Sequence, residues 1–126
     1  IALEAEAISG LLALCTAGKL ELVSSEALLF ETAKCPDETR REYAAVTLSL
    51  ARVFVAISES LVARARALGT LGIKPMDALH LASAEDAHAD YFCTSDDQLL
   101  KRARAVADLR TRAVSPLELI RELESW

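Results

Sequence analysis

Two acidic residues that lie far apart in this sequence occupy positions where α/β proteins bind their ligands. Asp77 falls in the first turn of an expected helix that opens at Pro75, and Asp96 follows a short apolar strand that ends at Thr94. Ligands and metal ions gather at the carboxyl ends of strands in such folds, beside the starts of helices. The two carboxylates are therefore predicted to meet at one edge of a sheet, in an arrangement that suits a divalent cation.

A structural role explains each aspartate when it is considered alone. A carboxylate in the first turn of a helix gains roughly 0.3–1 kcal/mol from the helix dipole, which accounts for Asp77. Asp96 is a suitable N-cap for the helix that follows it. Asp97 stands beside it, and the Thr-x-Asp spacing favours Asp96 as the acid that faces the site.

Glu31 is the third acid with a functional interpretation. It falls in the register of Ala27 and Leu28, on the apolar side of an expected helix, where an unpaired carboxylate is costly. The sequence therefore predicts a partner for this acid. The candidates are a metal ion shared with the two aspartates and a basic side chain such as Lys34, one turn further on.

Other polar residues beside these acids have two readings each. His80 lies three residues after Asp77 on the same helix face, so it either touches the site or packs at a helix–sheet seam. Thr94 and Ser95 bring hydroxyls to the strand end, where they position a metal-bound water or satisfy loop amides. Basic residues that flank the acids are expected to contact a phosphate backbone or to form solvated helix faces; they are Lys34, Arg40, Arg41, Lys101, Arg102 and Arg104.

Composition and periodicity predict one α/β domain over residues 1–126. Aromatic residues make up only 5% of the chain, and the abundant Ala and Leu favour helices over an all-β barrel. Expected strands at 20–23, 53–57, 91–94 and 112–114 alternate with expected helices at 2–17, 25–34, 37–51, 58–68, 75–87, 96–105 and from 115 onward. This order predicts a three-layer α/β/α sandwich with a central parallel sheet, in which the apolar run Val53–Ile57 is covered on both faces.

Charge, cysteines and glycines narrow the function classes. The net charge of −5 provides no general basic field, which disfavours a nucleic-acid partner unless a local patch binds it. Cys15, Cys35 and Cys93 form no C-x-x-C pair, so buried free thiols are expected and a zinc site is not. The few glycines form no phosphate-binding loop, which argues against a nucleotide-binding protein. No apolar run approaches the length of a membrane span, so a soluble cytoplasmic protein is expected.

The motifs taken together resemble those of PIN domains. Ser24-Ser-x-x-Leu-x-x-Glu31, Asp77-Ala-Leu-His-Leu-Ala-x-Ala84 and Phe92-Cys-Thr-Ser-Asp96 match three of the four acidic motifs of that family in order and spacing, and the resemblance runs through essentially the whole chain. It implies a metal-dependent endoribonuclease that uses Mg²⁺ or Mn²⁺ to hydrolyse single-stranded RNA. It also implies metal-binding roles for Glu31, Asp77 and Asp96, with Thr94 assisting. Many small bacterial members are toxins of toxin–antitoxin pairs (VapC-like), so an antitoxin protein and a homodimer are the implied protein partners.

One PIN motif has no counterpart in the chain. PIN domains open with a central strand that ends in an acid, and no such segment precedes Ile1. A further N-terminal segment of roughly 20 residues is therefore expected, from the length of a strand and its connection. Without it, a non-catalytic PIN-like module that binds a partner protein is the alternative. A phosphatase- or receiver-like protein with one nucleophilic aspartate is a further rival.

Overall fold

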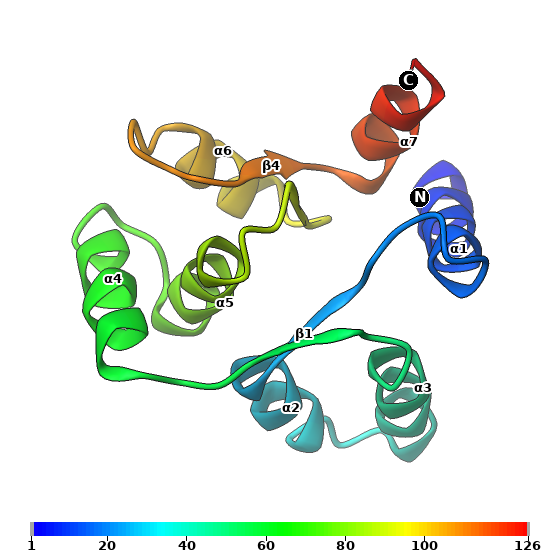
Figure 1. Ribbon diagram of the computed structural model, residues 1–126, viewed down its shortest axis with the longest axis horizontal. Coiled ribbons are helices and arrows are strands. Elements are labelled where there is room, and N and C mark those ends of the chain that lie inside the picture. The colour runs from blue at the N-terminus through cyan, green and yellow to red at the C-terminus, as the bar shows by residue number, and fades with distance from the viewer. Residues whose placement is uncertain (1, 126) are drawn as a thin grey trace.

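Helices and short strands alternate along the chain in the computed structural model, which describes residues 2–125 (Figure 1). The helices are α1 (Ala2–Thr16), α2 (Glu26–Ala33), α3 (Glu38–Leu48), α4 (Glu59–Gly69), α5 (Pro75–Asp86), α6 (Asp97–Arg104) and α7 (Pro116–Glu124). The strands are β1 (Val23–Ser25), β2 (Val53–Val55), β3 (Tyr91–Cys93) and β4 (Arg112–Val114).

Short polar side chains fix where most of the helices begin. The side chains of Ser25, Asp37, Ser58, Asp96 and Ser115 each accept a hydrogen bond from a backbone N–H in the first turn of the following helix. Such caps satisfy backbone donors that the helix itself cannot pair. The predicted helix starts at these positions are confirmed, because capping depends on only a few neighbouring residues.

The strands form two parallel pairs instead of one continuous sheet. β1 pairs with β2, with Val23 opposite Val53, and β3 pairs with β4, with Tyr91 opposite Arg112. The predicted α/β class with parallel strands is confirmed. The single central sheet is not seen, because within residues 2–125 no strand hydrogen-bonds β1 to β3. The expected N-terminal strand lies outside the described residues and stays a prediction.

The layers of the sandwich meet at β4, whose neighbouring residues face opposite sides. Ala113 belongs to a large apolar cluster with side chains of α4, α5 and α6, including Leu68 and Leu81. Val114 packs in a second cluster with Leu11 of α1 and Leu119 of α7. Figure 1 shows α4 and α5 on one side of the strands and α1 and α7 on the other, as the predicted three-layer arrangement requires.

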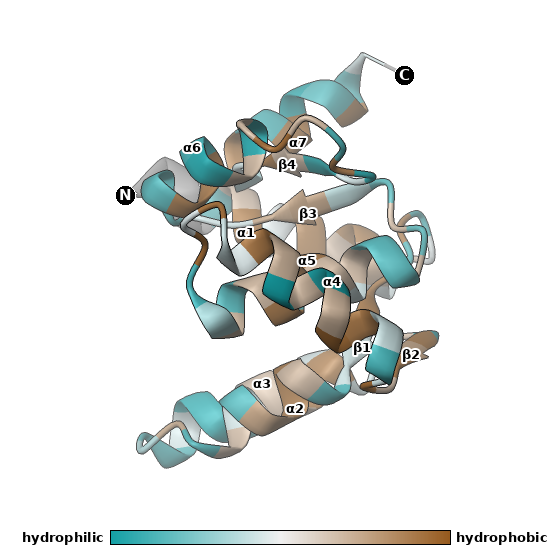
Figure 2. Ribbon diagram, turned by 90° about the vertical axis from the view of Figure 1, so that its left-hand side faces the viewer, coloured by the Kyte–Doolittle hydropathy of each residue, from teal (hydrophilic) through white to brown (hydrophobic). Residues whose placement is uncertain are grey.

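The helix pair α2–α3 carries an exposed apolar surface. Figure 2 shows these two helices extending away from the other helices, with apolar segments along them. The expectation that the 53–57 strand is covered on both faces is wrong, because Phe54 is 55% exposed. In the part of the chain that the structure describes, β2 pairs with β1 alone, and no layer covers the outer face of β2. We call the exposed large side chains of this region the apolar surface; they are Leu29, Phe30, Tyr43, Val46, Leu50, Phe54 and Ile57.

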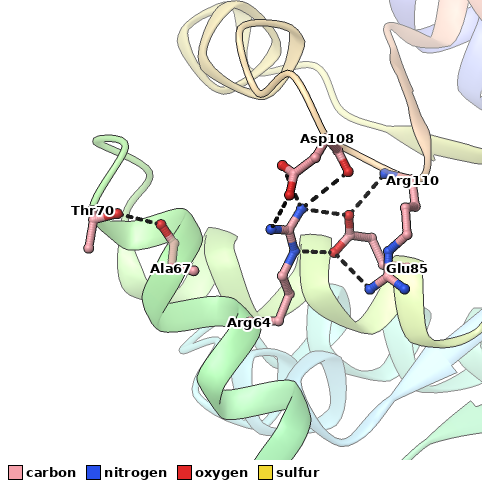
Figure 3. A network of polar contacts seen from close by, with 6 residues as sticks. All are labelled: Arg64, Ala67, Thr70, Glu85, Asp108 and Arg110. Carbon is pink, nitrogen blue, oxygen red and sulfur yellow. Dashed lines mark hydrogen bonds and ion pairs between the residues drawn. The ribbon is translucent and has the colours of Figure 1, made fainter.

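A buried ion pair ties α4, α5 and the α6–β4 loop together (Figure 3). The Glu85 carboxylate is fully buried and accepts hydrogen bonds from Nε and Nη2 of Arg64, at 2.7 and 3.0 Å, and from the backbone N–H of Arg110 at 2.9 Å. Arg64 also donates to the exposed carboxylate of Asp108, at 3.1 Å from Nη1. A buried charge of this kind persists only when it is fully hydrogen-bonded.

The cysteines form no disulfide among the residues that the structure describes, and they are not all buried. Cys15 and Cys35 are half-buried, and burial raises the pKa of the Cys15 thiol. Cys93 is exposed, so its predicted burial is wrong; it stands at the last position of β3, where the strand leaves the core. Within residues 2–125, no helix is both long enough and apolar enough to cross a lipid bilayer.

Candidate active site

Asp77 lies at the centre of the candidate site, in the first turn of α5. Pro75 occupies the start of the helix and Lys74 precedes it, with no side-chain cap at this end. The Asp77 side chain is half-buried, and burial raises its pKa. Nearby Asp96 and Glu31 raise it further by charge repulsion, whereas His80 and Lys74 lower it. The carboxylate is thus close enough to two other acids to feel their charges.

Asp96 lies near Asp77 as well, at the residue that precedes α6. Its Oδ1 accepts hydrogen bonds from the backbone N–H groups of Gln98 and Leu99, at 3.0 and 3.1 Å, and so caps α6. Its own N–H donates to Oγ1 of Thr94 at 3.2 Å, which fixes the turn after β3. Capping occupies Oδ1, while Oδ2 accepts no hydrogen bond from residues 2–125 and is left for a ligand.

The two aspartates line one narrow hollow. It has a volume of about 10 Å³, close to the space that one water molecule needs. Lys74, Gln98 and Arg102 also line it, and Asp97 does not. Asp97 is the first residue of α6, and Asp96 alone of the pair lines the hollow and raises the pKa of Asp77, so Asp96 is the acid that faces Asp77. A larger hollow of about 620 Å³, beside the start of β4, contains none of the predicted metal ligands.

Glu31 approaches the site from α2, but its environment differs from the predicted one. The side chain is 52% exposed, so the prediction that it is buried is wrong. Ala27 is the only residue of α2 that is buried, and Glu31 lies one turn later, beyond the part of the helix that the core covers. Its partner is His80, with 3.1 Å between Oε1 and Nε2, and not Lys34, which stacks over the Phe30 ring.

The chemistry of these donors fits a hard divalent cation. The charges of Glu31 on α2 and of Asp96 at the start of α6 both act on Asp77, and an Mg²⁺ or Mn²⁺ ion would relieve that repulsion with the oxygen ligands it prefers. Among the side chains that the structure describes, at residues 6–125, however, no three acidic, histidine or cysteine side chains are already close enough to form a cage. The acids are therefore neighbours that would have to draw together around an ion.

The PIN domain family model matches residues 3–106, which include all three acids and Thr94. The chain belongs to the PIN domain family. Comparisons with curated proteins and with solved structures give no match. PIN domains are generally nucleases that act on RNA and use divalent metal ions, so the predicted family and the general class of activity are confirmed. The receiver-like rival gains no support.

Basic side chains of this PIN domain stand beside its acids, although the net charge is negative. Arg102, one of the predicted phosphate contacts, lines the hollow and donates to the carbonyl of Gly72 at 2.9 Å. Sequence reasoning missed Lys74, which its spacing of three residues from Asp77 would have indicated. Other predicted contacts are engaged elsewhere: Arg104 pairs with Glu118 at 2.6 Å, and Arg41 donates to the carbonyl of Cys35 at 2.8 Å.

Proposed function

We propose that this PIN domain is a metal-dependent endoribonuclease that hydrolyses phosphodiester bonds of single-stranded RNA in the cytoplasm, with Mg²⁺ or Mn²⁺ as its cofactor. The observation that carries the proposal is the convergence of Asp77 and Asp96 on one hollow flanked by Lys74 and Arg102, with Glu31 close by. Acids with basic side chains at their rim match a site that binds a cation and a phosphate together.

Each residue of the site has a separate role in this proposal. Asp77, Glu31 and the free Oδ2 of Asp96 would hold the cation. When bound, the cation supplies Lewis-acid polarisation of the phosphate and lowers the pKa of a water molecule. Thr94 accepts the N–H of Asp96 and so orients its carboxylate. The Lys74 ammonium and the Arg102 guanidinium lie where they would contact phosphate oxygens.

The reaction is a hydrolysis. A water oxygen bonds to the phosphorus, the bond from phosphorus to one ester oxygen breaks, and that oxygen leaves with a proton as a hydroxyl. The half-buried position of Asp77 excludes part of the bulk water that would compete for a cation.

Replacement of one carboxylate tests the proposal. Asp77→Asn removes a charge and one strong ligand while keeping the shape of the side chain. We expect Mg²⁺-dependent cleavage of a single-stranded RNA to be lost, with an unchanged far-ultraviolet circular dichroism spectrum. Asp86→Asn is the matched control, since Asp86 is an exposed aspartate on the same helix and is expected to leave cleavage intact. Cleavage by Asp77→Asn at the wild-type rate would contradict the assignment.

The apolar surface supports a protein partner in addition to RNA. Its large apolar side chains are exposed on elements that pack side by side, with Tyr43 at 64% and Val46 at 67%, as is typical of a surface that another protein covers. We assign this surface to homodimerisation. We further propose that the domain is the toxin of a toxin–antitoxin pair. An antitoxin protein that binds the domain and blocks RNA cleavage would support this role.

The same surface supports a second candidate function. A PIN domain that binds a partner protein without catalysis would need the apolar surface and would not need the acids. It predicts tight protein binding that Asp77→Asn leaves unchanged, together with no rise in melting temperature on addition of Mg²⁺ or Mn²⁺. A rise in melting temperature that Asp77→Asn abolishes favours the nuclease.

A further inference from the structure

His80 connects two of the elements that supply the candidate site. It lies on α5, three residues after Asp77, and its side chain is only 10% exposed. Its Nε2 lies 3.1 Å from Oε1 of Glu31, which belongs to α2. The contact spans 49 positions of the chain, so it is a tertiary contact and not a local one. Of the two residues, the histidine is held by burial, whereas Glu31 is half-exposed.

The other ring nitrogen of His80 indicates how this hydrogen bond is oriented. Nδ1 is buried and has no hydrogen-bond partner among residues 6–125. A proton on Nδ1 would be a buried donor without an acceptor, which costs more than a bare nitrogen at the same place. A carboxylate can only accept, so Nε2 carries a proton and the Nε2–H group donates to the Glu31 carboxylate.

The hydrogen bond selects one conformation of a side chain that would otherwise move freely. A glutamate side chain loses much rotamer freedom when it is fixed, so a free carboxylate rarely stays in one conformation. Glu31 is at the end of α2, where Ala27 is the only buried residue, so packing does not hold its carboxylate. His80 holds it at Oε1 and leaves Oε2 for another contact.

We propose that His80 is a positioning residue, whose Nε2–H holds Glu31 on the side of Asp77, so that only a small movement would bring its carboxylate to a divalent cation. The inference rests on the proposed metal site, and it extends that site by one residue that does not contact the ion. Hydrogen bonds of this kind to a ligating carboxylate raise metal affinity because the ligand is already oriented when the ion arrives.

A merely structural histidine would behave differently. A residue that only fills the seam between α2 and α5 would affect stability, and an apolar side chain of similar size would replace it. A positioning residue affects Mn²⁺ affinity, and only a side chain that places a donor where Nε2 stood can replace it. Glutamine does so through its side-chain amide, whereas the shorter asparagine places its amide near the position of Nδ1.

The experiment is a Mn²⁺ titration of the full chain, with free Mn²⁺ measured by electron paramagnetic resonance. His80→Leu and His80→Asn are expected to weaken Mn²⁺ binding by about 10-fold or more, in the range found for such supporting residues. His80→Gln is expected to retain most of the affinity. His88→Asn is the control, because His88 is exposed, lies away from the acids, and has a positive φ of 54° that asparagine tolerates.

Two further readouts separate the possible failures. In a Glu31→Ala background, His80→Asn is expected to add no further loss, since the carboxylate that His80 would hold is already absent. Nitrogen-15 shifts of the imidazole are expected to place the proton on Nε2, and the opposite tautomer would overturn the inference. If the wild type binds Mn²⁺ and His80→Asn binds it as tightly, the positioning role is wrong and the metal site stands. If the wild type binds no Mn²⁺, the proposed metal site and the positioning role both fail.

Discussion

At the scale of single residues, Glu85 shows how strongly one side chain depends on another. Burial raises the pKa of its carboxyl group, but the hydrogen bonds from Arg64 and from the Arg110 amide lower it more, so the pKa lies below its ordinary value. The group is therefore kept as a carboxylate inside the protein. The pKa of Arg64 is raised in turn, chiefly by the hydrogen bond that it donates to Glu85.

Removal of Arg64 is expected to leave a buried charge without its main partner. Arg64→Met keeps much of the aliphatic side chain and should lower the free energy of unfolding by about 3–5 kcal/mol, as measured by urea denaturation. Arg66→Met is the control, because Arg66 is exposed on the same helix; its effect should stay within about 0.5 kcal/mol. Equal small effects of both changes would contradict the importance of the network in Figure 3.

The sequence predicts some of the site residues better than others, for a physical reason. Asp77 and Asp96 can be placed from neighbouring residues, since a helix start and a strand end lie within a few positions of each. Glu31 was expected to be buried because it shares a helix face with Ala27. Its real exposure depends on how far α2 extends past the core, and its bond to His80 depends on where α5 lies. Neither is a local property of the chain.

At the scale of elements, α7 illustrates how a helix start is stabilised. Ser115 and Glu118 form a capping box: the Ser115 side chain accepts the N–H of Glu118, and the Glu118 carboxylate accepts the N–H of Ser115. Arg104 of α6 donates to the same carboxylate at 2.6 Å. The backbone bond from Ser115 and the bond from Arg104 lower the pKa of Glu118 to about 2.

This lowered pKa predicts a stability contribution that depends on pH. Glu118 has a folded-state pKa below its unfolded value of about 4.3, so its charge stabilises the protein above that value, and the effect is lost as the pH falls toward 2. Glu118→Gln retains the capping geometry and removes the charge, which should cost about 0.3–1 kcal/mol at neutral pH.

Thermal unfolding from pH 7 down to pH 2 measures this contribution. The difference in melting temperature between wild type and Glu118→Gln should shrink as the pH falls through the acid range. Glu124→Gln, an exposed acid at the end of the same helix, serves as the control and should show no such trend. A difference that stays constant with pH would show that the charge of Glu118 has no part in stability.

Helices of this chain are more predictable than its strands, and the caps explain why. Ser58 or Asp37 satisfies the first turn of a helix within four residues, so the helix boundary is encoded locally. The first strand was expected over 20–23 and is found at Val23–Ser25, because its position is set by pairing with β2, some 30 residues later. Whether pairs of strands join into one sheet depends on contacts between residues that are even further apart in the sequence.

At the scale of the whole molecule, helices and apolar packing hold the two strand pairs in one domain. α5 contacts both β1 and β3, and its Leu81 is fully buried in the cluster that joins α4, α5 and α6. Two-stranded sheets are marginal by themselves, so this packing supplies most of the stability of each pair. The layout leaves α2, α3 and β2 covered on one side only, which is why the apolar surface is exposed (Figure 2).

The proposed homodimer is tested most directly on that surface. Val46→Glu places a charge at the most exposed position of the apolar surface, where burial in an interface would leave it unpaired and costly. We expect the wild type to elute as a dimer in size-exclusion chromatography with light scattering, and Val46→Glu to elute as a monomer with unchanged circular dichroism. Leu71→Glu is the matched control: Leu71 is 58% exposed but lies in the loop between α4 and α5, outside the apolar surface, so the dimer should persist. A wild type that stays monomeric at high protein concentration would contradict homodimerisation, and the apolar surface would then be the place to look for a different protein partner.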